Sequence, residues 1–238
     1  MLLSTLTAYT EKNIVPPEDF TPRSSEAAAR LDQLLGEYCR RCGTPLLPHF
    51  SLETISKLVR NHPESGRIFD FCVEVQLQVA ILQIDLARIG KSLRRPEATP
   101  LSDEDTFCHK MDVLRMNSDY IFRYRAIWDK VMSVIVLFVA PSEFEKFNKA
   151  GSRKVSFLKI AGASQALPSG FVDHILKTTE AFDKRFRTSE VHGSGSARRW
   201  VTGELEGWDS IQADMFWASN SLNKVLVALG AVFREPPP

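Results

Sequence analysis

The sequence has almost no net charge, little cysteine and no long apolar run. Its 30 Lys and Arg residues nearly balance 29 Asp and Glu residues, so the formal charge is +1 and no basic field covers the whole surface. A site for nucleic acid or another anion would therefore need a local group of cations. The most apolar stretch, residues 131–140, covers only about half of a membrane span. The first twenty residues lack the basic and apolar regions of a signal peptide, and we expect a cytoplasmic protein that does not enter the membrane.

Four cysteines in 238 residues do not indicate a disulfide framework. Cys39 and Cys42 have the spacing of a metal knuckle, and His49, Cys108 and His109 are scattered further candidates. A zinc site needs a second, regularly spaced ligand pair, which these positions do not supply. We interpret Cys39 and Cys42 as packing residues at the end of an amphipathic helix, with zinc or thiol chemistry as the weaker alternative. We expect no metal and no cofactor.

Apolar residues recur mostly at helical spacing, which predicts an all-α protein built on a helical bundle. Helices are expected over residues 24–42, 51–59, 66–93, 102–140, 142–150, 169–187, 197–205 and 209–232. The helix over 102–140 is long enough that we expect a kink or a break in it. Residues 154–160 fit a short strand and a helix about equally well. We expect one compact unit, in which an N-terminal helical extension (residues 1–65) packs on the main bundle (residues 66–235).

Residues 187–193, with the sequence RTSEVHG, carry the side chains best suited to chemistry. Arginine presents a permanent planar cation to phosphate oxygens, and histidine exchanges protons near neutral pH. On an ideal helix Arg187 and His192 would point about 140° apart. They converge only if the helix ends or distorts between them, or if two subunits share the site. The glycines that follow favour such a break.

A second group of charged residues lies within the predicted helix over 102–140. Asp119 and Arg123 are spaced i, i+4, as are Arg125 and Asp129, so both pairs can form along one helix face. Four apolar or aromatic residues run between them: Tyr120, Tyr124, Trp128 and Val131. One interpretation is ion pairs beside a core stripe. The alternative is a polar lining of the Arg187 and His192 site, in which Arg123 or Lys130 contacts phosphate.

The late Arg-x4-His pattern, together with residues 119–130 (DYIFRYRAIWDK), resembles the HEPN superfamily (higher eukaryotes and prokaryotes nucleotide-binding), in particular a bacterial branch of unknown function. The resemblance covers about residue 66 to the C-terminus. It implies a HEPN-like four-helix bundle that dimerises. It also implies a metal-independent endoribonuclease, a hydrolase of toxin–antitoxin, defence or RNA-processing systems.

The same resemblance implies roles for individual residues. Arg187 would orient or stabilise the scissile phosphate, and His192 would act as acid and base. Thr188 stands where the family often has Asn, Asp or His, and its hydroxyl can still bind phosphate. The expected substrate-binding residues are Thr188, Lys184, Arg185, Arg123, Lys130 and Arg198.

The expected partners are RNA or a nucleotide, a second copy of the chain, and a cognate antitoxin or nucleotidyltransferase. A different class of function also fits the sequence. The chain would then be a non-catalytic helical binding or interaction protein that retains the Arg-His motif.

Overall fold

A computed structural model describes residues 25–44, 51–93 and 102–187, and besides these Asn220, Asn223, Leu226 and Gly230. Over these residues the regular structure is entirely helical, which confirms the predicted all-α bundle. The elements are α2 (Ser25–Arg41), α3 (Leu52–Leu58), α4 (Ser65–Leu93), α5 (Asp103–Val139), the 3-10 turn η1 (Pro141–Glu143), α6 (Phe144–Asn148), α7 (Arg153–Ala161), α8 (Phe171–Phe182) and the π-helical turn η2 (Asp183–Arg187).

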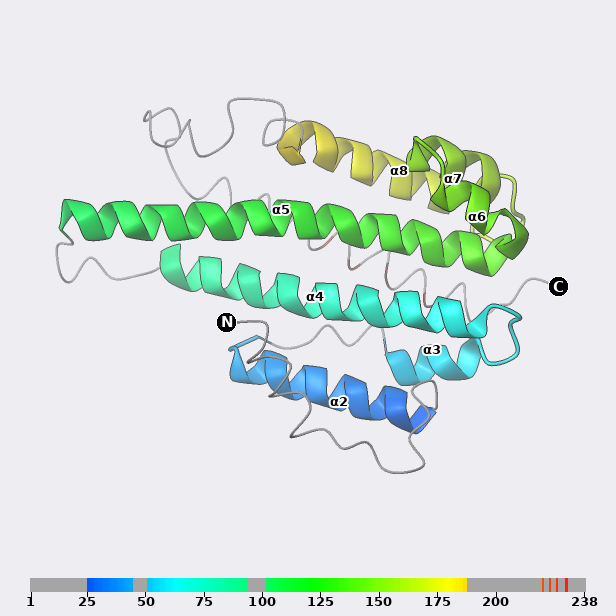
Figure 1. Ribbon diagram of the computed structural model, residues 1–238, viewed down its shortest axis with the longest axis horizontal. Helices are drawn as coiled ribbons and strands as arrows, with labels where there is room; N and C mark the ends of the chain where they lie inside the picture. The colour runs from blue at the N-terminus through cyan, green and yellow to red at the C-terminus, as the bar shows by residue number, and fades with distance from the viewer. Residues whose placement is uncertain are drawn as a thin grey trace.

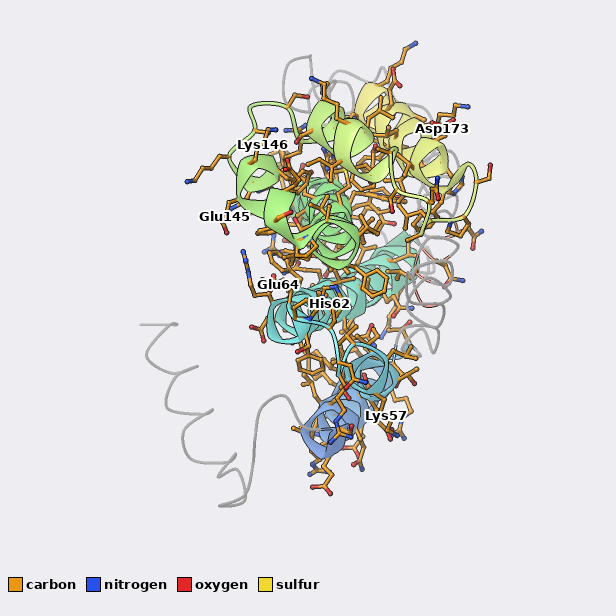
Figure 2. All side chains as sticks on the ribbon, turned by 90° about the vertical axis from the view of Figure 1, so that its right-hand side faces the viewer. Lys57, His62, Glu64, Glu145, Lys146 and Asp173 are labelled. Carbon is orange, nitrogen blue, oxygen red and sulfur yellow. The ribbon has the colours of Figure 1, made fainter. Side chains whose placement is uncertain are left out.

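The two long helices α4 and α5 run side by side in opposite directions and form the middle of the bundle (Figure 1). Helices α2 and α3 lie on the outer side of α4, and α6, α7 and α8 lie on the outer side of α5. The view along the bundle shows the same order of layers (Figure 2). The α4–α5 pair therefore separates the two groups of shorter helices.

Local signals set several helix boundaries where the sequence predicts them. The Ser51 and Ser102 hydroxyls cap α3 and α5 by accepting the N–H groups of Thr54 (3.3 Å) and Asp105 (3.1 Å). Helix α2 is terminated by Gly43, two residues beyond its last residue, whose φ of 82° places it in the left-handed region. Two hydrogen bonds of 3.0 Å, Thr44 N to Cys39 O and Gly43 N to Arg40 O, close this end as a Schellman motif.

The core is centred on the second half of α5, which is buried on all sides from Val131 to Phe138. The predicted aromatic stripe of Tyr120, Tyr124 and Trp128 is also buried, as expected for core residues. The Tyr124 ring lies 4.2 Å from the ring of Phe182 on α8, measured between centroids. These aromatic contacts fix the end of α8 against the middle of α5.

Two expectations are settled by the observed helices. Of the kink or break expected in the long helix, the break is wrong: α5 is a single helix of 37 residues. Its sequence contains no proline or glycine, the usual causes of a sharp kink. Residues 153–161 form helix α7 rather than a strand. There Phe157 and Ala161 are buried four positions apart while Val155 and Leu158 are exposed, a helical and not an alternating pattern.

The turn before α4 is joined to the end of α5 by His62, which Figure 2 shows beside Glu64. Its Nδ1 accepts the backbone N–H of Glu64 at 3.1 Å, so in the neutral ring Nε2 carries the proton and donates to the Phe138 carbonyl at 3.1 Å. The ring also stacks on Phe138. His62 is therefore a structural residue.

None of the helices in the described ranges combines the length and the hydrophobicity that crossing a membrane requires.

Candidate functional site

Charged side chains from three parts of the bundle meet at the carboxylate of Asp183, the first residue of η2. Lys154 Nζ, from α7, lies 2.6 Å from Asp183 Oδ2. Arg125 Nε, from α5, lies 3.3 Å from Oδ2 and 3.2 Å from Oδ1. Arg187 Nη1, from the end of η2, lies 4.0 Å from Oδ1. We call these residues, together with Asp129, the Asp183 cluster.

Arg125 is the buried member of the cluster, with 11% of its side chain exposed. Its Nη1 lies 2.6 Å from Asp129 Oδ1, so the pair predicted from the i, i+4 spacing is confirmed. A buried guanidinium is tolerated only when it is paired and hydrogen-bonded, and here it has a carboxylate on each side. Arg125 therefore ties α5 to the end of α8 and is shielded from solvent.

Among the residues that the structure describes, Arg187 is the cation of the cluster whose charge no carboxylate balances. Two carboxylates, Asp129 and Asp183, stand against the charges of Arg125 and Lys154, and their shortest contacts are 2.6 Å. The 4.0 Å contact of Arg187 is longer than a hydrogen bond, and 48% of its side chain is exposed. Lys184, also in η2, is exposed beside it. Among the described residues, Lys184 and Arg187 are therefore exposed cations at this end of α8.

The π-helical turn and its aromatic neighbours position Arg187. Phe182 and Phe186 flank Asp183 in sequence, and their ring centroids lie 5.0 Å apart. Phe182 is buried against Tyr124, so the start of η2 is held on α5. A π turn holds more residues than an α turn, since its hydrogen bonds run from i to i+5, and such turns occur frequently at functional sites.

Arg123 and Lys130 lie on the side of α5 that faces α4, away from Arg187. Arg123 Nη1 donates to Gln78 Oε1 at 2.8 Å, and its Nε lies 3.8 Å from Asp85 Oδ2. Lys130 Nζ lies 3.4 Å from Glu74 Oε1. Both cations thus join α5 to α4. The Arg123 guanidinium turns to these α4 partners instead of forming the expected contact with Asp119.

Burial beside Arg123 raises the pKa of the Asp85 carboxyl. The positive charges of Arg123 and Arg88 act in the opposite direction but are outweighed. Asp85 is therefore a largely buried carboxyl within the α4–α5 contact whose ionised form burial disfavours.

The structure describes only some of the other residues expected at the site. Arg185 belongs to η2, next to Lys184. Thr188, His192 and Arg198 lie outside the described residues, and so do the predicted helices over 197–205 and most of 209–232. The convergence of Arg187 and His192 therefore stays a prediction.

The contact between Lys154 and Asp183 was not predicted from the sequence. The residue lies 29 positions before Asp183, in a segment whose secondary structure was open, and no local spacing connects the two. The available signal was Asp183, an acidic residue within a basic stretch. A carboxylate that becomes buried needs cationic partners, and these can come from elsewhere in the fold.

Within the ranges that the structure describes, no group of three His, Cys, Asp or Glu side chains comes together to hold a metal ion. Cys39 is buried between α2 and α4 against Leu35, Ala80 and Ile84. Burial, with a smaller contribution from Cys42, raises the pKa of its thiol. Cys39 is therefore a packing residue in this structure.

An open pocket of about 310 Å³ lies between the end of α7 and the start of α8, at the opposite end of α8 from the Asp183 cluster. Its lining includes Leu158, Pro168 and Val172, and Asp173, which Figure 2 labels, is its ionisable residue. A pocket whose one ionisable lining residue is a carboxylate does not suit a phosphate. The Asp183 cluster remains the better candidate for an anion.

No family model, no curated protein and no solved structure matches this chain. A proposal for its function therefore rests on the residues and the geometry described above.

Proposed function

We propose that the protein binds RNA at the C-terminal end of α8 and cleaves it without a metal ion. Arg187 is the phosphate-binding residue, and His192 is the acid and base. The observation that supports this proposal is the state of Arg187, an exposed guanidinium whose charge the two carboxylates of the Asp183 cluster leave unbalanced. The resemblance of the Arg-x4-His pattern and of residues 119–130 to the HEPN superfamily supports the same assignment.

The chemistry requires few groups because RNA carries its own nucleophile. A base removes the proton of the 2′-hydroxyl, whose oxygen attacks the adjacent phosphorus, and an acid protonates the departing 5′-oxygen. The products are a 2′,3′-cyclic phosphate and a 5′-hydroxyl. Arg187 would stabilise the negative charge that develops on the phosphate oxygens. One His192 from each subunit of a homodimer would supply the two proton transfers.

The proposal extends to partners. An RNase that acts on cellular RNA needs to be held inactive, and a cognate antitoxin or nucleotidyltransferase would do this in a toxin–antitoxin or defence setting. An anionic partner would bind the same exposed cations that we assign to RNA, Arg187 and Lys184.

The test is cleavage of a mixed RNA substrate in EDTA by the wild type, Arg187→Ala and His192→Ala, with a 2′-deoxy substrate in parallel. Arg60→Ala is the matched control, because Arg60 is an exposed arginine in the turn that follows α3, and α3 packs on α4 and not on α8. We expect cleavage in EDTA by the wild type and by Arg60→Ala. Loss of Arg187 or His192 should reduce the rate by at least about 100-fold, as expected for a charge-stabilising or acid–base group. The deoxy substrate should stay intact.

A non-catalytic RNA- or partner-binding protein is the second candidate. The ion pairs that Arg125 and Lys154 form with Asp183 favour this candidate, because ion pairs between side chains can stabilise a fold without taking part in catalysis. RNA left intact by the wild type but bound in a manner that depends on Arg187 would establish this candidate. Cleavage that persists in both Arg187→Ala and His192→Ala would contradict the proposed catalytic pair.

A further inference from the structure

The geometry points to Lys154 as a second phosphate-binding cation, so that α7 and η2 together hold one phosphodiester at the Asp183 cluster. This inference rests on the proposed RNA-binding function. It assigns to the site a residue from a different helix, which the spacing of the Arg-x4-His motif does not reveal.

The first support is that Lys154 and Arg187 approach the same carboxylate. Lys154 Nζ lies 2.6 Å from Asp183 Oδ2, and Arg187 Nη1 lies 4.0 Å from Asp183 Oδ1. Since both oxygens belong to one carboxylate, the two cations lie close to each other although they come from α7 and η2. One phosphate group has enough oxygens to bind both.

The second support is the difference in exposure between the three cations. The side chains of Lys154 and Arg187 are 28% and 48% exposed, whereas that of Arg125 is 11% exposed. Arg125 thus compensates the charge of Asp183 from the inner side, where it is also bound to Asp129. The charges of Lys154 and Arg187 face the solvent side, where an RNA phosphate would arrive.

The third support is the number of donors that remain. A lysine ammonium has three N–H donors, and among the residues that the structure describes Lys154 contacts one acceptor group, the Asp183 carboxylate. Arg187 has five donors and a contact too long for a hydrogen bond. Asp183 is then a positioning residue that holds both cations in place while leaving donors for phosphate.

The experiment measures binding of a fluorescent single-stranded 2′-deoxy oligonucleotide, which keeps the phosphates and is not cleaved, at several NaCl concentrations. The slope of log K against log salt changes by about 0.7 for each phosphate contact with a single strand. We expect Lys154→Gln to reduce the slope by about this amount and to weaken binding about tenfold, the effect of losing one charge-assisted hydrogen bond. Lys154→Arg should keep the wild-type slope. Lys159→Gln, an exposed lysine also on α7, is the matched control.

The outcomes separate this inference from the proposed function. If Arg187→Gln lowers the slope and Lys154→Gln does not, the assignment of Lys154 is overturned and the RNA site at Arg187 stands. If neither variant differs from Lys159→Gln, the proposed function itself fails.

A second measurement uses the wild type, because Lys154→Gln also removes an ion pair and can lower stability. Lysines are acetylated briefly with and without the oligonucleotide, and the modified positions are read by mass spectrometry. Protection of Lys154 but not of Lys159 is the expected result. Equal modification of Lys154 in both samples would refute the inference without recourse to a variant.

Discussion

At the scale of single residues, the four cysteines differ in exposure, and this predicts their reactivity. Cys108 is exposed, Cys42 is partly buried, and Cys39 and Cys72 are buried. Burial raises the pKa of the Cys39 and Cys72 thiols, which lowers the fraction of reactive thiolate. We expect a maleimide to modify Cys108 first and Cys42 more slowly, and to reach the buried pair only on unfolding. Peptide mass spectrometry over a time course measures this, and rapid modification of Cys72 in the native protein would contradict it.

Asp85 makes stability depend on pH. Its pKa is raised in the folded state by burial, so the folded protein binds this proton more tightly than the unfolded chain does. The stability associated with protonated Asp85 is present below the unfolded pKa of the carboxyl and is lost as pH rises through the folded pKa. Relative to the wild type, Asp85→Asn should therefore gain stability as the pH rises above the unfolded pKa of an aspartate, about 3.9.

Urea unfolding of the wild type and Asp85→Asn at several pH values measures this difference. Asp112→Asn is the control, because Asp112 is an exposed aspartate in an ion pair at 3.7 Å. A difference between wild type and Asp85→Asn that does not change with pH would contradict the prediction.

The candidate site could be predicted from the sequence only as far as its local spacing reaches. Arg125 and Asp129 lie four positions apart on one helix, and their pairing follows from helix geometry. Arg123 has the same spacing to Asp119, yet it binds Gln78 and contacts Asp85 on α4. The direction in which α5 meets its neighbours decides between these outcomes, and that is a property of tertiary structure.

At the scale of helices, Arg125 is the charged connection between α5 and the end of α8. Its removal would leave Asp129 without this partner and Asp183 with Lys154 as its close cation. We expect Arg125→Ala to lower the free energy of unfolding by about 3 kcal/mol, the usual effect of removing one member of a buried ion pair. Chemical denaturation measures the loss.

Arg115→Ala is the matched control for this prediction, because Arg115 is an exposed arginine on the same helix with a weak contact to Asp112. Its effect should stay within about 0.5 kcal/mol. Equal stabilities of Arg125→Ala and Arg115→Ala would show that the buried pairs do not hold α8 in place.

Helices were easier to predict than their interruptions. The serine caps and Gly43 act within a few residues, so the starts of α3 and α5 and the end of α2 follow from sequence. The expected break in α5 was inferred from length alone, and length does not break a helix that packs along α4 and contains no proline or glycine. Residues 153–161 stayed ambiguous because only the fold determines which of their apolar residues are buried.

At the scale of the whole molecule, helix α5 separates two groups of basic residues. Arg123 and Lys130 lie on the side that faces α4, where they hold the two long helices together. Arg125, Lys154 and Arg187 meet at Asp183 on the other side of α5, where α7 and α8 pack. The sequence predicts Arg123 and Lys130 at one site with Arg187, but in the bundle Arg123 and Lys130 join α5 to α4, whereas Arg187 is exposed to solvent.

The π-helical turn at 183–187 has a consequence for how the motif would be recognised in other chains. A π turn holds about one residue more than an α turn, so η2 is equivalent to a one-residue insertion into an ordinary helix. A chain that lacked one residue here and formed an α turn would present its arginine in nearly the same direction as Arg187. A chain of equal length that relaxed to an α turn would rotate that arginine by about 100°. An alignment gap of one position before the arginine is therefore compatible with the same site, whereas unchanged length does not guarantee it.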